Sequence, residues 1–389
     1  MEAADLKAKI MLEGQQNNCS IEFVKELFGC YTDLCWRLFV SKKFYQALGR
    51  VEIWPEITGA NACGITYDDV LLVPQVKTQI HTRRLPDISV QLGPYRLKKP
   101  IMASPMDTIT GEKMVRLMHR LGGIAVLPRG DLKQNLKLCR QLSKDKVACV
   151  YAVGLKEYLK EAREYKRRGA KVILIDVAHG GMKRAMAAAV EIKDKLKLAV
   201  MASTIASYRQ AMEYKKLGIK MARVGVGPGG LCITRLVAGA GMPQLSAIWE
   251  TAESGLQIIA DGGIRKPADL AKAIAAGADL VMIGSLLAGT EETPGEVIGG
   301  RKKARGQASA DYMQDNGLEL GEFRAAEGID TMVELKGSAE RVINDLVAGL
   351  RSAMSYTGVK NIKEFQEKAE FVLVSKATGK ENQPHILKR

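Results

Sequence analysis

Cys232 lies where a short apolar run passes into a glycine-rich turn, within the segment RVGVGPGGLCITRLVAGAGMPQLSA at 223–247. The glycines of this turn are Gly225, Gly227, Gly229 and Gly230. Glycine permits positive φ and close approach, so successive backbone N–H groups can converge on an anion such as phosphate. A thiol two residues beyond would face the bound group, and its thiolate would be a nucleophile. An ordinary turn followed by a buried cysteine is the alternative, and it is the commoner meaning of one short glycine pattern.

Polar or glycine-rich residues also follow the other short apolar runs of the chain. They are Ser104 to Asp107, Pro128 and Arg129, Asp176 and His179, Ser203 and Thr204, Asp261 to Gly263, and Gly284 with Ser285. A carboxylate at Asp261 can accept both hydroxyls of a ribose, while Gly263 and the Gly284–Ser285 pair offer N–H groups to a phosphate. A helix cap is the alternative role for Asp261 taken alone.

Eight apolar runs, each suited to burial on both faces, alternate with amphipathic stretches from Thr66 onward. The runs are IMAS, GIAVLP, VACVYAV, VILIDVA, LAVMAST, KMARVGVG, QIIADGG and DLVMIGS, and the stretches between them include 156–168, 182–195, 208–217 and 267–276. This α/β alternation predicts a parallel sheet, and eight repeats predict a closed (β/α)8 TIM barrel with its chemistry at the carboxyl ends of the strands. An open doubly wound sheet is the alternative, but no first strand turn carries G-x-G-x-x-G. Before the barrel, TYDDVLLVP is expected to be a loop and DISVQLGPYRLKKP a hairpin.

Residues 1–65 predict an N-terminal helical extension, with the barrel domain at 66–389. Apolar residues recur at about helical spacing in IEFVKELFGCYTDLCWRLFVSKKFYQAL, which favours one or two amphipathic helices. Such an extension would cap the barrel or bind a partner.

Composition limits the classes of function. The net charge is +15, but the basic residues are mixed with acidic ones and aromatics are only 5%, so a nucleic-acid partner is not expected. No apolar run reaches a membrane span and the first residues do not resemble a signal peptide, which favours a cytoplasmic protein. The seven cysteines form no C-x-x-C pair, which argues against a disulfide framework or a zinc ribbon.

Three separate segments resemble the IMP dehydrogenase and GMP reductase family. They are the Cys232 turn, PIMASPMDTITGEKM upstream, and IIADGGIRKPADLAKAIAAGADLVMIGSLLAGTEETPGE downstream. Several separated motifs carry a much lower false-positive risk than one short pattern. The regulatory modules that family members often insert after the second strand are not expected, because 130–146 leaves room for one helix only.

The resemblance implies that Cys232 adds to C2 of a purine nucleoside monophosphate, and that hydride passes between this adduct and NADPH or NAD. It implies that Thr234 lies beside the thiol and that Glu292 pairs with Thr234 and passes a proton. Asp176, His179 and Thr204 would lie on the cofactor side. The substrate-binding residues would be Ser104, Met106, Arg223, Gly229, Gly230, Asp261, Gly263, Gly284, Ser285, Gly306 and Gln307.

For three of these residues a structural role is the alternative. Thr234 can be an ordinary loop hydroxyl, Glu292 can compensate a helix dipole, and His179 can be a hydrogen-bonded structural residue. The resemblance also implies a homotetramer, and a potassium ion on backbone oxygens of Gly227, Gly229 and Cys232.

The direction of the reaction depends on the segment after Ser309. IMP dehydrogenases carry a long flap there with an Arg–Tyr pair that activates water, whereas this chain has only 18 positions from Ser309 to Glu327 and no such pair. This favours a GMP reductase-type reaction, in which GMP and NADPH give IMP, NADP and ammonia. An IMP dehydrogenase and an inactive nucleotide-binding homologue are the alternatives.

The chain departs from the family pattern at three further positions. Gly230 stands where the family usually has Ser, Ala304 where it has Tyr, and Gln307 where it has Met. The two lost hydroxyls contact phosphate in the family, so Arg305 or Lys303 is expected to supply a charge instead.

Overall fold

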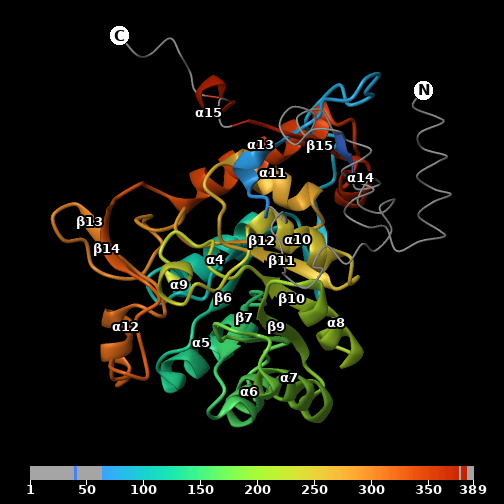
Figure 1. Cartoon of the computed structure of the whole chain (residues 1–389). Helices are drawn as coiled ribbons and strands as arrows, with labels where there is room; N and C mark the ends of the chain where they lie inside the picture. Colours follow the sequence, from blue (N-terminus) through green and yellow to red (C-terminus); the bar gives the residue numbers. More distant parts are fainter. Residues whose placement is uncertain (1–38, 42–63, 376–377, 383–389) are drawn as a thin grey trace.

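The computed structural model describes residues 39–41, 64–375 and 378–382 (Figure 1). Its centre is a closed barrel of eight parallel strands, hydrogen-bonded in chain order and closed by the pairing of the last strand with the first. The strands are β5 (Ile101–Ala103), β6 (Ile124–Leu127), β7 (Val150–Val153), β8 (Val172–Ile175), β9 (Ala199–Ile205), β10 (Met221–Val224), β11 (Gln257–Asp261) and β12 (Leu280–Ile283). The predicted (β/α)8 barrel is therefore confirmed.

Seven helices follow the first seven strands, and all of them bury an apolar face. They are α4 (Glu112–Leu121), α5 (Leu132–Lys144), α6 (Tyr158–Arg167), α7 (Lys183–Leu196), α8 (Tyr208–Lys216), α10 (Gln244–Ala252) and α11 (Pro267–Ala275). Side chains of Asp131 and Ser207 cap α5 and α8 by accepting backbone N–H groups that the helix cannot pair. The single helix α5 fills the segment between β6 and β7.

The eighth connection, from β12 to its helix α13 (Ala339–Tyr356), carries an insertion. It contains the antiparallel pair β13 (Arg301–Arg305) and β14 (Asp330–Glu334), with the short helix α12 (Ala310–Asp315) between them. Figure 1 shows this insertion in orange at one side of the barrel, near the short helix α9 (Thr234–Val237) that follows β10. Because it leaves the carboxyl end of a strand, the insertion belongs to the face on which barrel enzymes carry out chemistry.

The opposite end of the barrel is closed by a hairpin, as the sequence predicts. It consists of β3 (Val90–Leu92) and β4 (Tyr95–Leu97). At its tip, Gly93 has φ of 51° and lies against Val172, Ala199 and Met221, at or next to the starts of three barrel strands. The tip therefore plugs the amino-terminal end of the barrel.

A three-stranded antiparallel sheet corrects two expectations. Val70–Leu72, expected to be loop, form β2, which follows the 3-10 turn η1 (Tyr67–Asp69). Phe39–Ser41, within the segment expected to be helical, form β1. Both pair with β15 (Glu370–Leu373), which follows α14 (Ile362–Lys368), and a last short helix, α15, spans Thr378–Glu381. These short strands are hard to predict from the residues around them, because their pairing partner lies near the other end of the chain.

The rest of the expected N-terminal helical extension lies outside the described residues. Within the described part of the chain, no helix has the length and apolarity needed to span a bilayer.

Candidate functional site

The Cys232 turn leaves β10 beside the end of β11, and glycine is required at its first position. Gly225 has φ of 143°, and a Cβ there would lie 2.1 Å from the carbonyl oxygen of Asp261. The buried Gln244 side chain holds the two strand ends together, because its Nε2 donates to the carbonyls of Val224 (2.9 Å) and Asp261 (3.1 Å). The sequence analysis did not single out Gln244, whose role depends on a contact made from the following helix.

The thiol and the hydroxyl expected to accompany it lie together. Cys232 Sγ is 3.2 Å from Thr234 Oγ1, and the Cys232 N–H donates to the Gly229 carbonyl at 3.0 Å. Cys232 is partly exposed, whereas Cys139 and Cys149 are buried and burial raises their pKa values. Among these three cysteines, Cys232 therefore has the access that a nucleophile needs.

Glu292 does not make the expected pairing with Thr234 among the described contacts. Its two carboxylate oxygens accept from the Ser338 hydroxyl (2.6 Å) and the Ala339 N–H (2.8 Å), at the start of α13. Negative charge at that position stabilises the helix through its unpaired N–H groups and its dipole. These contacts fit the alternative noted for Glu292, dipole compensation, and its part in proton transfer stays a prediction.

A different glutamate, Glu327, lies against the Cys232 turn. Its carbonyl accepts from the Ile233 N–H at 2.8 Å, and the next residue, Gly328, forms a bridge with Cys232. The side chain is half-buried, one residue away from that bridge. Sequence reasoning used Glu327 only to mark the end of a short link, because the pairing of 232 with 328 is a tertiary contact.

A chain of alternating charges crosses the mouth of the barrel. Asp176, nearly buried, accepts from Arg129 Nε and from Arg223 Nη2, each at 3.0 Å. Arg223 Nε then lies 3.7 Å from Asp261 Oδ2, and this Nε has no hydrogen-bond partner. Burial raises the pKa of Asp261, and the charge of Arg223 opposes that increase. The predicted cofactor residue Asp176 and the predicted substrate residues Arg223 and Asp261 are thus brought together.

The glycine turns expected to hold phosphate converge. A Cβ on Gly230 would lie 3.3 Å from Ser285 Oγ, and one on Gly262 would lie 2.9 Å from the Gly229 nitrogen. The neighbouring Gly263 has φ of 80°, a conformation that favours glycine. Lys336 Nζ donates to the Ser285 carbonyl at 3.3 Å, which adds a positive charge that the sequence analysis missed.

A second group of predicted substrate residues surrounds Gly284. A Cβ there would meet Ser104 Oγ at 2.8 Å and Met106 Sδ at 3.0 Å. Ser104 Oγ is buried without a partner. An unpaired buried hydroxyl is unfavourable by about 1–3 kcal/mol, so a ligand that bonds to it gains affinity.

Gly306 and Gln307 lie between the insertion and the Cys232 turn. The Gly306 N–H donates to the Ile329 carbonyl, and a Cβ on Gly306 would lie 3.2 Å from the Leu231 carbonyl oxygen. Gln307 Nε2 is buried without a partner. This amide is therefore an unpaired donor, next in the chain to Gly306, which lies against Leu231.

The two cations expected to replace the lost phosphate contacts are engaged elsewhere. Arg305 pairs with Asp107, Asp311 and Asp315, and Lys303 Nζ lies 2.7 Å from Asp311 Oδ2. The expectation that either one supplies a phosphate contact is corrected by these ion pairs. Lys336 is the basic residue that the structure brings to Ser285.

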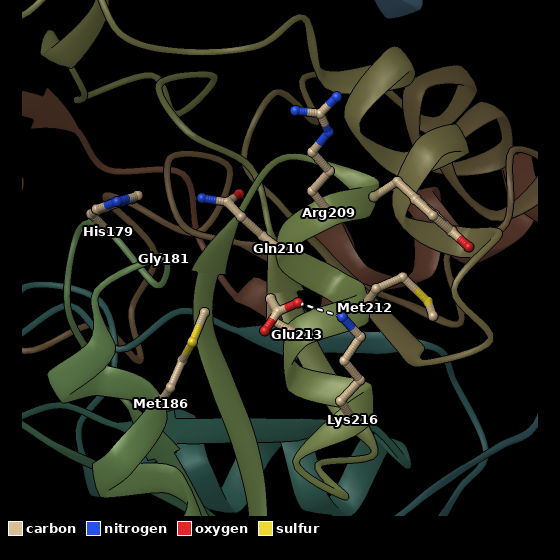
Figure 2. Close-up of a pocket in the computed structure, with 9 residues that line it drawn as sticks. His179, Gly181, Met186, Arg209, Gln210, Met212, Glu213 and Lys216 are labelled. Carbon is tan, nitrogen blue, oxygen red and sulfur yellow. Dashed lines mark hydrogen bonds and ion pairs between the residues drawn. The ribbon is translucent and has the colours of Figure 1, made fainter. Parts of the chain in front are cut away.

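His179 lines an open pocket of about 430 Å³ between α7 and α8 (Figure 2). The Gly180 N–H donates to the Thr204 carbonyl at 2.7 Å, which joins the loop of His179 to the end of β9. A Cβ on Gly181 would lie 2.6 Å from the His179 ring and 2.7 Å from Gln210 Nε2, so glycine lets these side chains approach. The pocket is lined by His179, Gly181, Met186, Tyr208, Arg209, Gln210, Met212, Glu213 and Lys216. Its mixed apolar and polar lining is suited to a flat, partly polar ligand group.

The groups expected to hold potassium are all backbone oxygens, which is the donor chemistry that this ion takes in proteins. The Gly229 carbonyl already accepts the Cys232 N–H and retains a second lone pair. Arg235, whose guanidinium donates to the Val226 and Met242 carbonyls, braces the same turn. The donor set fits the ion, and potassium binding stays a prediction.

Comparison with known proteins agrees with this geometry. A family model described as IMP dehydrogenase / GMP reductase domain matches residues 64–385. The chain is 32% identical to the inosine-5'-monophosphate dehydrogenase of Cryptosporidium parvum, over 83% of this chain and 95% of that protein. It is 39% identical to the enzyme of that name from Thermoplasma acidophilum, over 59% of this chain and 50% of that protein. It is 41% identical to the one from Aquifex aeolicus, over 63% of this chain and 53% of that protein.

The alignments with the last two relatives thus span about half of their length. The family model covers most of the chain, and the Cryptosporidium parvum relative is matched over nearly its full length. This chain belongs to the IMP dehydrogenase and GMP reductase family.

Proposed function

We propose that this protein oxidises IMP to XMP with NAD through a covalent adduct on Cys232. The observation that carries the proposal is the Cys232–Thr234 pair, 3.2 Å apart, in a glycine turn at the carboxyl end of β10. The relatives named above are IMP dehydrogenases, which favours this direction over the reductase reaction that the short link after Ser309 suggests.

The nucleotide would lie across the barrel mouth. The backbone of Gly229 and Gly230 and the loops after β11 and β12 would hold the phosphate, with Lys336 adding charge. Asp261 would accept the ribose hydroxyls, and the free amide of Gln307 would donate to the base. This arrangement presents C2 of the purine to the thiolate of Cys232.

The nicotinamide would bind on the side of Asp176, with the remainder of the cofactor toward Thr204, His179 and the pocket that His179 lines. When bound, it takes up or supplies the hydride at C2. Asp176 is held between Arg129 and Arg223, which fixes the direction of its carboxylate on this side of the site.

After hydride has left C2, water must attack the adduct while Cys232 Sγ departs. Glu327 lies in the segment whose backbone pairs with the Cys232 turn, so we assign it the proton from that water. Arg305 is unsuited to this step, because its hydrogen bond with Asp107 raises its pKa above the ordinary value. Release of the sulfur then gives XMP and restores the thiol.

GMP reduction with NADPH is the second candidate. The observation that favours it is the absence of an Arg–Tyr pair from the 18 positions after Ser309. The adduct on Cys232 would be common to both reactions; in this direction ammonia leaves C2 and hydride arrives there. For either reaction, we propose that the enzyme is a cytoplasmic homotetramer. Its substrates are nucleotides and not nucleic acid.

Two steady-state assays on the same preparation distinguish the candidates. One follows XMP from IMP and NAD, and the other follows ammonia and NADPH loss with GMP. Continuous XMP formation supports the dehydrogenase, and GMP-dependent NADPH oxidation without XMP formation supports the reductase. Tight binding of IMP or GMP with neither turnover would overturn both and favour the inactive homologue.

A further inference from the structure

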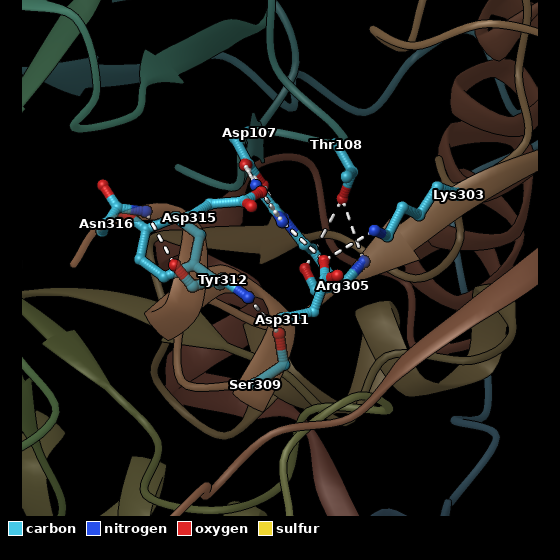
Figure 3. Close-up of polar contacts among 9 residues, drawn as sticks. All are labelled: Asp107, Thr108, Lys303, Arg305, Ser309, Asp311, Tyr312, Asp315 and Asn316. Carbon is cyan, nitrogen blue, oxygen red and sulfur yellow. Dashed lines mark hydrogen bonds and ion pairs between the residues drawn. The ribbon is translucent and has the colours of Figure 1, made fainter. Parts of the chain in front are cut away.

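Arg305, the last residue of β13, is surrounded by three carboxylates (Figure 3). Its Nη2 lies 2.6 Å from Asp107 Oδ2, and its Nη1 lies 2.5 Å from Asp311 Oδ2 and 2.5 Å from Asp315 Oδ2. The guanidinium side chain is only 11% exposed. Short ion pairs in which one largely buried guanidinium binds several carboxylates hold their geometry better than isolated pairs on the surface.

The three carboxylates come from two parts of the fold. Asp107 lies in the loop after β5, whereas Asp311 and Asp315 lie on α12. The backbone N–H of Arg305 also donates to the Thr108 hydroxyl at 3.1 Å. The guanidinium fork therefore fastens α12 to the barrel through one side chain, and a lysine, with a single point charge, cannot reproduce the fork.

Between the two aspartates, α12 carries the buried Tyr312, which packs against Arg305. Tyr312 is 4% exposed, and its ring centroid lies 5.3 Å from the Arg305 guanidinium carbon. Burial raises the pKa of its phenol, and the charge of Arg129 opposes that increase. The N-cap of α12, Ser309, forms a bridge with Gly328, which also forms a bridge with Cys232, so α12 begins beside the Cys232 turn.

We propose that Arg305 is a positioning residue, which holds α12 against the loop after β5 and thereby keeps α12 and its Tyr312 beside the Cys232 turn, on the side where the nicotinamide binds. The last clause rests on the proposed function; the fastening of α12 does not. The shortened 309–327 link would then work as a fixed wall of the cofactor site.

The first test needs no substrate. Hydrogen–deuterium exchange of peptides from 310–326 is compared between the unaltered protein, Arg305→Gln and the control Arg301→Gln. Arg301 lies on the same strand, and its nearest carboxylate, Glu334, is 3.7 Å away with both side chains largely exposed. We expect exchange in 310–326 to rise about tenfold in Arg305→Gln and to stay unchanged in the control. Equal exchange in all three proteins would overturn the fastening of α12.

The second test measures the cofactor. Titration with NAD and NADPH should give a Kd about tenfold weaker for Arg305→Gln, with the nucleotide Kd within twofold and partial recovery in Arg305→Lys. Raised exchange with an unchanged cofactor Kd would overturn the link to the cofactor side. No binding of either cofactor to the unaltered protein would instead overturn the proposed function. Should Arg305→Gln not fold, Asp315→Asn, which alters a half-exposed partner, replaces it in both tests.

Discussion

Thr234 Oγ1 lies 3.2 Å from Cys232 Sγ, and only Ile233 separates the two residues in the chain. The backbone N–H of that intervening residue donates to the Glu327 carbonyl, so the nucleophile, the hydroxyl and a glutamate are tied to one short stretch of backbone. A hydroxyl in this position can donate to the thiolate or relay a proton to and from the purine.

Removing the Thr234 hydroxyl should therefore slow the chemical step. We expect Thr234→Val to lower kcat by about a hundredfold, the size of a typical proton-transfer contribution. Thr234→Ser keeps the hydroxyl and should lose less than tenfold. Steady-state kinetics with a nucleotide titration will show whether KM stays constant; a fall in kcat that is equal in both variants would contradict a role for the hydroxyl.

Substitution of Glu327 should mainly affect turnover, whereas substitution of Glu292 should mainly affect stability. Glu327→Gln should reduce turnover about a hundredfold with little change in melting temperature, because its carboxylate is assigned to proton transfer. Glu292→Gln should lower the free energy of unfolding by about 1 kcal/mol through the weakened cap on α13, with turnover within twofold. Enzyme kinetics and thermal unfolding measure the two effects. A loss of turnover in Glu292→Gln with little change in Glu327→Gln would favour Glu292 as the residue that passes a proton.

The positions of these two glutamates show what the sequence could predict and what it could not. The eight barrel strands are predictable because each is buried on both faces and is followed by an amphipathic helix. The partners of the two glutamates were not predictable, because Glu292 accepts from the N–H of Ala339, 47 positions along the chain, and Glu327 meets the Cys232 turn through the 232–328 bridge and the Ile233 N–H. Local sequence patterns indicate which residues are buried and where helices form, but they do not indicate which distant loops pair.

The strands outside the barrel and the ion pairs of Arg305 were missed for the same reason: they depend on contacts between residues far apart in the chain. Val70–Leu72 form a strand because Glu370–Leu373 lie beside them, about 300 positions later. Arg305 was expected to be available for phosphate, since nothing in its neighbourhood indicates that Asp107 approaches from the loop after the first barrel strand. Net charge along a segment does not reveal which charges are already paired.

Potassium should stimulate turnover if the backbone oxygens of Gly227, Gly229 and Cys232 bind it. Initial rates at constant ionic strength in potassium, sodium and choline chloride will measure this, and we expect at least a severalfold advantage for potassium. Equal rates in the three salts would leave the predicted site without a role in catalysis.

Asp279 should make stability depend on pH. Burial raises its pKa from the ordinary value to about 6, although the carboxylate accepts the Ile258 N–H at 2.8 Å. Because the folded state holds this proton more tightly than the unfolded state, the Asp279 contribution to stability is present below about pH 4 and is lost as pH rises through 6. Asp279→Asn should therefore stabilise the protein at pH 8 by about 1–3 kcal/mol and have little effect at pH 4. Chemical denaturation at the two pH values measures the difference; an equal effect at both would contradict the raised pKa.

The central claim is the covalent step at Cys232, and the turnover of Cys232→Ser tests it most directly. The hydroxyl of serine is far less nucleophilic than a thiolate, whereas the phosphate contacts are made by backbone and remain. We predict that turnover of the preferred nucleotide falls at least about a thousandfold in this variant while its Kd for that nucleotide stays within threefold. Turnover within tenfold of the unaltered protein would contradict the covalent mechanism.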